Sequence, residues 1–261
     1  MIPKAYIARW RDEAPWSNDD QVEQDLIISR ALVALFSDEF LNENLAFRGG
    51  TALHKLYLNP APRYSEDIDL VQIKAGSIKP ILDKIDEVIN FFEEPWSVKQ
   101  KANNNTILYR FTSETGTRLR LKIEINCREH FNLLDWEPFP FKVESEWFRG
   151  ECEIMTYKLE ELLGTKLRAL YQRKKGRDLF DLYYAHQHTE VDWDQVLHCY
   201  QEYMKFVVDK PPTAKQFLLN LEEKKTSDLF NGDMEGLLRS GIDYNEGDAF
   251  EFIGNILKVD Q

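Results

Sequence analysis

Two aspartates one residue apart, Asp67 and Asp69, have the spacing of a metal-binding pair. The segment Ser65–Ile73 is predicted to be a strand, and side chains two residues apart on a strand point to the same face. Neighbouring carboxylates repel each other unless a cation lies between them. Mg²⁺ takes oxygen ligands and commonly combines one or two carboxylates with substrate phosphates. The pair therefore predicts a divalent-metal site, although an Asp-x-Asp sequence also occurs at exposed strand edges and in turns.

A glycine pair, Gly49-Gly50, stands 18 residues before Asp67. The short apolar segment Leu45–Arg48 predicts a buried strand before the glycines, and Thr51–Leu58 predicts a helix after them. Glycine lets a backbone approach a ligand closely. The amides at the start of a helix favour an anion. These features predict a phosphate cradle in which Thr51 caps the helix or contacts a phosphate oxygen. A tight strand-to-helix turn is the alternative interpretation, and it accounts for one glycine better than for two.

The spacing of the glycine pair also excludes two common nucleotide-binding motifs. It is not Gly-x-Gly-x-x-Gly, and no Gly-Lys-Ser/Thr sequence follows it. This disfavours a dinucleotide-dependent dehydrogenase and a P-loop NTPase. A phosphate cradle close to a metal-binding pair nevertheless indicates a nucleotide.

A third acid, Glu124, is a candidate for the same site. The segment Arg118–Asn126 alternates strictly, which predicts a strand with leucine and isoleucine on one face and Glu124 on the other. If this strand pairs beside Ser65–Ile73, Glu124 converges with Asp67 and Asp69 on a site that could hold two metal ions.

The remaining pattern predicts the elements that must position these residues. Asn18-Asp19-Asp20 is a good N-cap for a helix over Gln21–Phe40. Before residue 153 the sequence further predicts a helix, two strands and a loop with two prolines: Ile78–Phe92, Trp96–Lys101, Thr106–Thr112 and Asp135–Pro140. From Lys158 onward it predicts helices: Leu159–Arg173, Leu179–His188, Trp193–Val208, Ala214–Lys224 and Asp248–Leu257. We therefore expect an α+β protein, with an α/β core with a mixed sheet over residues 1–152 and a helical domain over residues 153–261.

Composition sets limits on location and partners. The chain is 43% hydrophobic and 30% charged, which is enough for a folded core. No apolar run approaches the roughly 20 residues of a membrane span. The three cysteines are widely separated, which disfavours disulfides and a zinc site and is typical of a cytoplasmic protein. The net charge of −12 is unusual for a nucleic-acid binder, but Lys166–Arg177 has six basic residues and no acid.

Four motifs in order resemble the AbiEii/AbiGii-type nucleotidyltransferase toxins of the DNA polymerase β-like superfamily. They are Gly49–Leu53 with Arg63–Leu70, the acidic strand Lys122–Asn126, the lysine helix Leu162–Leu170, and an Arg then Asp-x-x-Asp motif within Arg173–Leu182. The resemblance covers roughly residues 47–181, and Gln21–Phe40 is similar to the helix that precedes these motifs in the family. Gly50-Thr51 stands where the superfamily commonly has glycine-serine, and Glu124 where many members have aspartate.

The resemblance implies a polymerase β-like nucleotidyltransferase core and a role for each motif. Asp67 and Asp69, with Glu124 as a possible third ligand, would hold Mg²⁺ or Mn²⁺. A nucleoside triphosphate (NTP) would bind at Gly49, Gly50, Thr51, Ser65, Lys166 and Arg177, and Lys175 could also contact the triphosphate or RNA. The catalytic residues would be Asp67, Asp69, Lys166, Asp178 and Asp181. Of the last two, one could orient Lys166 while the other touches nucleotide or acceptor, because i and i+3 share a helix face.

The implied function is transfer of a nucleoside monophosphate from the NTP to a tRNA or other RNA end. The protein would be the toxin of a type IV-like bacterial toxin–antitoxin or phage-defence pair, with a cognate antitoxin as partner. Two competing functions are a phosphotransferase that uses the γ-phosphate and a non-catalytic nucleotide-binding module. Without the resemblance, Lys166 would be interpreted as a surface lysine beside apolar residues. Asp178 could equally be the N-cap of Leu179–His188.

Overall fold

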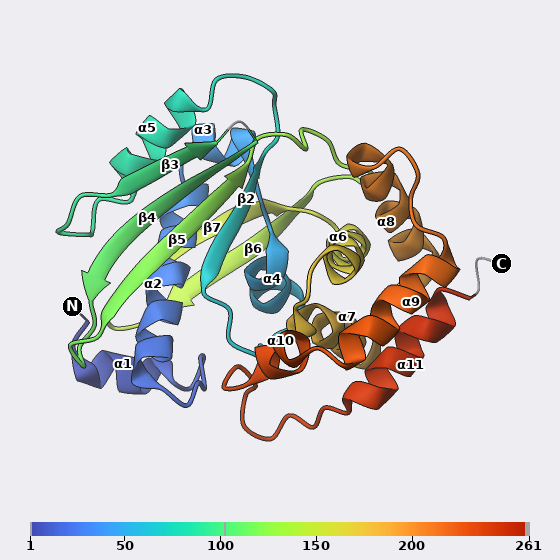
Figure 1. The fold of residues 1–261 in the computed structure, drawn as a ribbon. Helices are drawn as coiled ribbons and strands as arrows, with labels where there is room; N and C mark the ends of the chain where they lie inside the picture. The colour runs from blue at the N-terminus through green and yellow to red at the C-terminus, as the bar shows by residue number, and fades with distance from the viewer. Residues whose placement is uncertain (1, 102, 259–261) are drawn as a thin grey trace. The chain divides into compact units, whose positions relative to one another are not determined.

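The computed structural model describes residues 2–101 and 103–258, and the chain divides into two compact units, Met1–Tyr157 and Lys158–Gln261 (Figure 1). The first unit contains the sheet. Its strands are β1 (Leu45–Arg48), β2 (Asp67–Gln72), β3 (Ser97–Lys101), β4 (Asn104–Thr112), β5 (Arg118–Asn126), β6 (Glu137–Glu144) and β7 (Arg149–Thr156). Its helices are α1 (Lys4–Trp10), α2 (Asp19–Phe36), α3 (Glu39–Asn44), α4 (Gly49–Ala52), a π-helical turn Leu53–Tyr57, and α5 (Lys79–Val88).

The seven strands form one mixed sheet in the order β3-β4-β5-β2-β1-β7-β6. β2 is the middle strand in this order. It pairs antiparallel with β1 and parallel with β5. The expected α+β class with a mixed sheet is therefore confirmed, and so are the predicted bounds of β1 and β5. The conditional pairing of the Glu124 strand beside the Asp67–Asp69 strand is also present.

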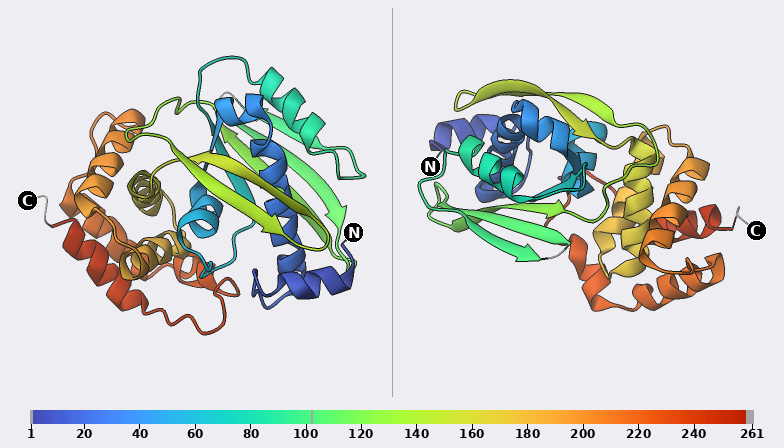
Figure 2. Two further views of the ribbon diagram at one scale, coloured as in Figure 1. Left: turned by 180° about the vertical axis from the view of Figure 1, so that it is seen from behind. Right: turned by 90° about the horizontal axis from the view of Figure 1, so that it is seen from above.

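Helix α2 forms the core of the first unit together with the sheet. Eleven consecutive residues, Val22 to Leu32, include only one that is not buried, Arg30. The sheet curves around this helix, with β6 and β7 on one side and β4 and β5 on the other (Figure 2). Ile123 and Ile125 of β5 lie on the buried face, and each buried aliphatic side chain of this kind contributes about 1.5–3 kcal/mol to folding.

Two sequence expectations for the first unit were wrong. Asp135–Pro140 was expected to be a loop, but Pro138 and Pro140 lie within β6. β6 is an edge strand, and residues two apart direct their backbone nitrogens the same way, so both prolines can face away from β7 without losing a ladder hydrogen bond. The single helix expected over Gln21–Phe40 is two, because Asp38 accepts a hydrogen bond from the Leu41 amide (2.9 Å) and starts α3.

β7 was not expected from the sequence, and it bears on the division of the chain. The expected limit at residues 152 and 153 falls inside this strand, whereas contacts divide the chain after Tyr157. The inward positions of β7 are Gly150, Cys152, Ile154 and Thr156, so its sequence lacks the clear alternation of aliphatic and polar residues that identifies β5.

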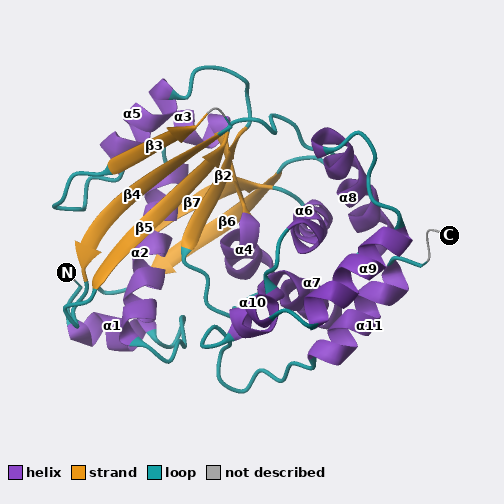
Figure 3. Cartoon of the chain, in the orientation of Figure 1, coloured by secondary structure: helices purple, strands orange, loops and turns teal. Residues whose placement is uncertain are grey.

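The second unit is helical over the residues that the structure describes, Lys158 to Lys258 (Figure 3). Its helices are α6 (Leu159–Gln172), α7 (Gly176–His188), α8 (Trp193–Val207), α9 (Ala214–Lys225), α10 (Asp228–Asn231), a 3₁₀ turn Gly232–Met234, and α11 (Glu246–Ile256). α6 packs closely on α8 because Gly164 lacks a side chain, and a Cβ there would lie 3.0 Å from the Val196 carbonyl oxygen. Among the described residues, no helix has the length and apolar character needed to cross a membrane.

Candidate active site

The glycine pair and the aspartate pair lie against each other. Arg48 of β1 pairs with Asp69 of β2, which places Gly49, the next residue, directly over the Asp69 side chain. A Cβ atom on Gly49 would come within 2.9 Å of the Asp69 Cβ and Cγ atoms, closer than real contacts allow. Gly49 also has a φ angle of +80°, a conformation that favours glycine. Two motifs 18 residues apart therefore meet at one point of the sheet.

Thr51 connects the helical segment after the glycines to the start of β2. Its side chain is 2% exposed, and its hydroxyl donates to the Asp67 carbonyl oxygen. The Ser65 hydroxyl lies 2.8 Å from the Thr51 hydroxyl and can donate to it. The expectation that Thr51 caps the helix is wrong, since Arg48 is the N-cap residue and no side chain caps α4. The hydrogen bond of Thr51 instead fixes the backbone of Asp67 relative to Gly49 and Gly50.

Lys122 bridges two of the three acids. Parallel pairing places Asp67 beside Lys122 and Asp69 beside Glu124, so all four side chains share one sheet face. The Lys122 ammonium lies 2.9 Å from Asp67 Oδ2 and 3.2 Å from Glu124 Oε2. Partial burial alone would lower the pKa of Lys122, but the hydrogen bond to Asp67 and the charges of Asp67 and Glu124 outweigh it and raise this pKa. The lysine is therefore a cation at neutral pH.

The donor atoms of this face suit a hard divalent metal. Asp67 and Asp69 offer carboxylate oxygens beside a glycine, and Glu124 offers more from the next strand. Within the described part of the chain, however, no three acidic, cysteine or histidine side chains are already arranged to hold a metal. Asp67 and Glu124 instead converge on the Lys122 ammonium. Asp67 and Asp69 are thus the residues that fit Mg²⁺, with Glu124 close by on the paired strand.

In the second unit, Lys166 of α6 lies between two aspartates of α7. Its ammonium is 3.2 Å from Asp178 Oδ1 and 2.9 Å from Asp181 Oδ2, and both aspartate side chains are fully buried. Arg173 adds two further contacts to Asp178, at 2.6 and 2.8 Å. Burial alone would raise the pKa of Asp178, but the Lys166 charge and the Arg173 hydrogen bond outweigh it and lower this pKa. The interpretation of Lys166 as a surface residue is wrong, because it is only 7% exposed.

The position of Asp178 also differs from the sequence alternative. α7 begins at Gly176, three residues before the expected start, so Asp178 lies in the first turn and does not cap the helix. Its carboxylate is bonded to Lys166 and Arg173. A negative charge in the first turn still interacts favourably with the helix dipole.

Arg177 and Lys175 meet at an acid that the sequence did not single out. Asp233 accepts from the Lys175 ammonium (2.9 Å) and from the Arg177 backbone amide (3.2 Å), and it lies 3.6 Å from Arg177 Nε. Asp233 is 56 residues from Arg177 in the sequence, in a 3₁₀ turn with no motif of its own. No local pattern could have identified it, because its role depends on how the turn packs on α7.

A second buried ion pair lies close to Thr51. Asp25 of α2 accepts from Lys55 (3.0 Å) and from the Trp10 and Trp16 indoles (3.0 and 3.4 Å). These residues line a cavity of about 110 Å³ that also reaches Thr51 and Ser65. The sequence offered one signal for this site, an aspartate within the buried stretch of α2, but its partners come from separate segments.

Comparisons with known proteins concern the chain as a whole and not the positions of these side chains. The family described as "Nucleotidyl transferase AbiEii toxin, Type IV TA system" matches residues 30–254, which is most of the chain. No curated protein sequence matches the chain.

Two solved structures have a similar fold. The nucleotidyltransferase toxin MenT4 from Mycobacterium tuberculosis is 18% identical, with 99% of each chain covered and a TM-score of 0.63. JHP933 from Helicobacter pylori is 20% identical, with 93% of this chain and 95% of that chain covered and a TM-score of 0.52. At these identities the likeness concerns the fold, and the arrangement of the site rests on the contacts described above.

Proposed function

Because this chain belongs to the AbiEii family of nucleotidyltransferase toxins, we propose that it moves a nucleoside monophosphate from an NTP to the end of a tRNA or other RNA. The family implies an NTP substrate and an antitoxin partner. The proposed setting is the cytoplasm of a bacterium, where the protein acts as the toxin of a type IV-like toxin–antitoxin or phage-defence pair. The division into a core over residues 1–152 and a helical domain over residues 153–261 remains part of this proposal.

The observation that carries the proposal is the contact between Gly49 and Asp69. Because glycine has no side chain, the backbone at Gly49 lies directly beside the carboxylates that fit Mg²⁺. A triphosphate bound to this backbone would therefore lie next to the metal. Asp67 and Asp69 are the proposed metal ligands, with Glu124 as a third. Bound Mg²⁺ would neutralise phosphate charge at the reacting phosphoryl group.

The transfer itself is a substitution at the α-phosphorus. An acceptor hydroxyl loses its proton to solvent as its oxygen bonds to this phosphorus, the bond from the phosphorus to the oxygen that bridges to the β-phosphate breaks, and pyrophosphate leaves. Gly49, Gly50 and Thr51 would contact the triphosphate through backbone amides, because the Thr51 hydroxyl is already bonded to Asp67. Ser65 can still accept a hydrogen bond, and it lies beside the same segment.

Lys166 and Arg177 are proposed to bind triphosphate charge. A lysine ammonium has three N–H donors, and Asp178 and Asp181 account for two of them at Lys166. Asp178 and Asp181 therefore act as positioning residues for that lysine. Arg177 is held by Asp233 and keeps 34% of its side chain exposed, which leaves guanidinium donors for an anion.

The test is a transfer assay with total tRNA and each of the four NTPs, labelled on the α- or the γ-phosphate. We expect the α-label, and not the γ-label, to reach RNA, which separates nucleotidyl transfer from phosphotransfer. The variant Asp69→Asn should lower transfer more than about 100-fold, because a metal ligand is lost. Asp86→Asn is the matched control, since Asp86 is an exposed carboxylate on α5. Equal labelling by wild type and Asp69→Asn would refute the metal role, and a wild type that labels nothing would favour a non-catalytic module.

A further inference from the structure

The charged side chains of β3, β4 and β5 all lie on one face of the sheet, the face that carries Asp67 and Asp69. The pairing register establishes this, because residues directly opposite on paired strands point to the same side. Thr106 of β4 pairs with Glu124 on one side and Lys99 on the other. In the same way Arg110 pairs with Arg120, and Asn104 with Lys101.

This face is strongly basic, although the whole protein carries a net charge of −12. We call it the basic face and define it by six side chains: Lys99, Lys101, Arg110, Arg118, Arg120 and Lys122. Glu124 is the one acidic residue that these three strands contribute to it. The opposite face of the same strands carries no charge, and Tyr109 and Leu121 there are buried. A concentration of like charge of this kind attracts a polyanion.

Four members of the basic face form no ion pair with the residues that the structure describes, although the charge of Arg110 also acts on Glu94. Lys122 contacts Asp67 and Glu124, and Arg118 forms an ion pair with Glu94. The other four, Lys99, Lys101, Arg110 and Arg120, are exposed. Within the described part of the chain none of these four forms an ion pair, and Arg110 bonds only to the Ser97 hydroxyl. Their charge is therefore available to a ligand.

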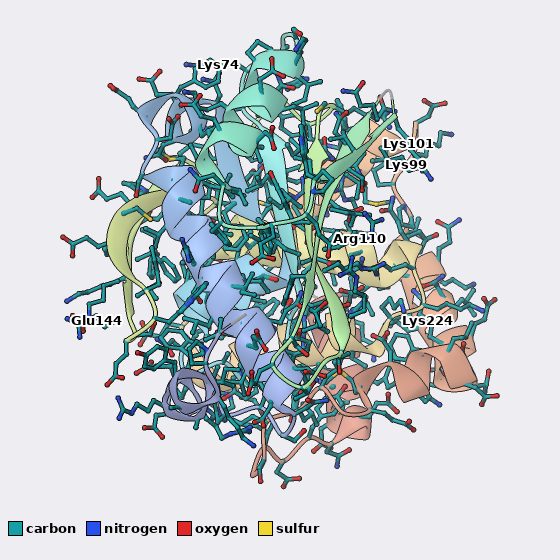
Figure 4. All side chains as sticks on the ribbon, turned by 90° about the vertical axis from the view of Figure 1, so that its left-hand side faces the viewer. Lys74, Lys99, Lys101, Arg110, Glu144 and Lys224 are labelled. Atoms are coloured by element: carbon teal, nitrogen blue, oxygen red, sulfur yellow. The ribbon has the colours of Figure 1, made fainter. Side chains whose placement is uncertain are left out.

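Two cations of this face are direct partners in the pairing register. Arg110 and Arg120 lie directly opposite each other on antiparallel strands, and like charges in that position are destabilising. A stability role does not explain this pair, whereas an anion bound across both guanidinium groups would remove the repulsion. Figure 4 shows Arg110 on the same side of the sheet as Lys99 and Lys101.

We propose that the basic face binds the sugar–phosphate backbone of the acceptor RNA and leads its end to Asp67 and Asp69. This inference rests on the proposed function. One row of paired residues runs across the sheet from Asp69 through Glu124 and Thr106 to Lys99. At about 4.8 Å between strands, the row spans about 14 Å, so the basic face begins beside the proposed reaction site.

The face recognises phosphate and not bases. Its other positions on β3, β4 and β5 are Ser97, Asn104, Thr106, Leu108, Thr112 and Asn126, and none is aromatic. Sheets that read single-stranded RNA by sequence stack bases on aromatic side chains. Binding here should therefore depend strongly on salt and little on base sequence.

The test measures binding of fluorescent total tRNA and of two oligonucleotides of about 15 nucleotides, poly(U) and poly(A), without NTP or Mg²⁺. The variant K99Q/K101Q/R110Q should bind at least about tenfold more weakly than wild type, and its log–log salt slope should fall by about 2. The control K4Q/K79Q/K205Q removes the same charge from exposed lysines elsewhere. It should bind like wild type. The single variant R110Q should unfold at no lower urea concentration than wild type.

The outcomes separate this inference from the proposed function. Equal loss in both triple variants would show that only net charge matters and would overturn the inference. Unchanged binding in K99Q/K101Q/R110Q would overturn it as well, even if Asp69→Asn abolishes transfer. Loss of binding in this variant alone would support the basic face, even if no NTP is transferred to RNA by the wild type.

Discussion

Gly49 lies so close to Asp69 that a single added methyl group would collide with the carboxylate. This contact joins the proposed phosphate cradle to the proposed metal ligands, and it makes the first prediction unusually specific. Gly116 offers a matched control, because it has nearly the same φ (+86°, against +80°) but no heavy atom within 4 Å of the position that a Cβ atom would take.

We expect Gly49→Ala to abolish transfer and Gly116→Ala to preserve it. Both substitutions place alanine in a left-handed conformation, which costs about 1–2 kcal/mol of stability. Only Gly49→Ala adds the collision that displaces Asp69, so it should also be the less stable variant. Urea unfolding and the α-label assay measure the two effects. Transfer by Gly49→Ala at the rate of Gly116→Ala would contradict the close contact.

A second prediction concerns the cation that already lies between two acids. Replacing Lys122 with methionine leaves Asp67 and Glu124 facing each other without a counter-charge. Mg²⁺ alone should therefore raise the melting temperature of Lys122→Met more than that of wild type, as measured by thermal shift without NTP. Lys84→Met is the control, because Lys84 forms an exposed ion pair with Glu87 on α5. If Mg²⁺ stabilises wild type and Lys122→Met equally, the lysine does not compete with the metal.

The third prediction concerns the buried cluster of the second unit. Asp178→Asn removes the charge that balances Lys166 and Arg173, and loss of one partner from a buried ion pair typically costs about 3–5 kcal/mol. We expect a loss of this size in urea unfolding. Asp243→Asn, in an exposed loop, should change stability by less than about 0.5 kcal/mol. A loss below about 1 kcal/mol for Asp178→Asn would show that the cluster is not needed for folding.

The same aspartate predicts a pH dependence. The pKa of Asp178 is lower in the folded protein than in the unfolded chain. The unfolded chain therefore binds its proton first as the pH falls, and the stabilising contribution is lost as the pH drops through the folded pKa. The contribution is complete above the ordinary aspartate pKa of 3.8. The stability difference between wild type and Asp178→Asn should accordingly shrink below about pH 4, when unfolding is measured from neutral pH downward. A constant difference would contradict the lowered pKa.

Lys224 predicts a trend of the same sign at alkaline pH, because its pKa is also lowered in the folded protein. This lysine of α9 is 2% exposed and donates to the Leu170 and Tyr171 carbonyls at the end of α6. Burial lowers its pKa to about 8, despite the opposing effect of the Asp178 charge. Between about pH 8 and the ordinary lysine value of 10.5 the unfolded chain binds the extra proton, so wild type should gain stability relative to Lys224→Met. Parallel curves for the two proteins over this range would refute the shift.

The sequence was informative where one local pattern dominates. β5 alternates without interruption, and its predicted bounds match the structure. The same reasoning failed for β6, because its two prolines are compatible with a strand only at a sheet edge. The place of a strand in its sheet is a tertiary property that the local sequence does not specify. The break before α3 depended on one capping aspartate, Asp38, within an otherwise helical pattern.

The candidate site likewise contains residues that the sequence identified and residues that it did not. Asp67, Asp69 and the glycines could be identified from spacing, since both motifs are local. The bridging role of Lys122 could not, because it requires the parallel pairing of two strands and a partner 55 residues away. Asp233 and the Asp25–Lys55 pair likewise depend on contacts between distant segments. Charged residues whose partners come from distant segments are therefore harder to predict than residues that belong to a local motif.

The position of Asp67 and Asp69 on alternate residues of β2 has a consequence for how the protein can diverge. Because β2 begins at Asp67, deleting or inserting one residue between Asp67 and Asp69 would put the two carboxylates on opposite faces of the strand. One of the two carboxylates would then turn toward the apolar interior, where Ile68 and Leu70 are buried. A change of a single residue in the length of β2 would therefore separate the proposed metal-binding pair and disturb the hydrophobic core in one step.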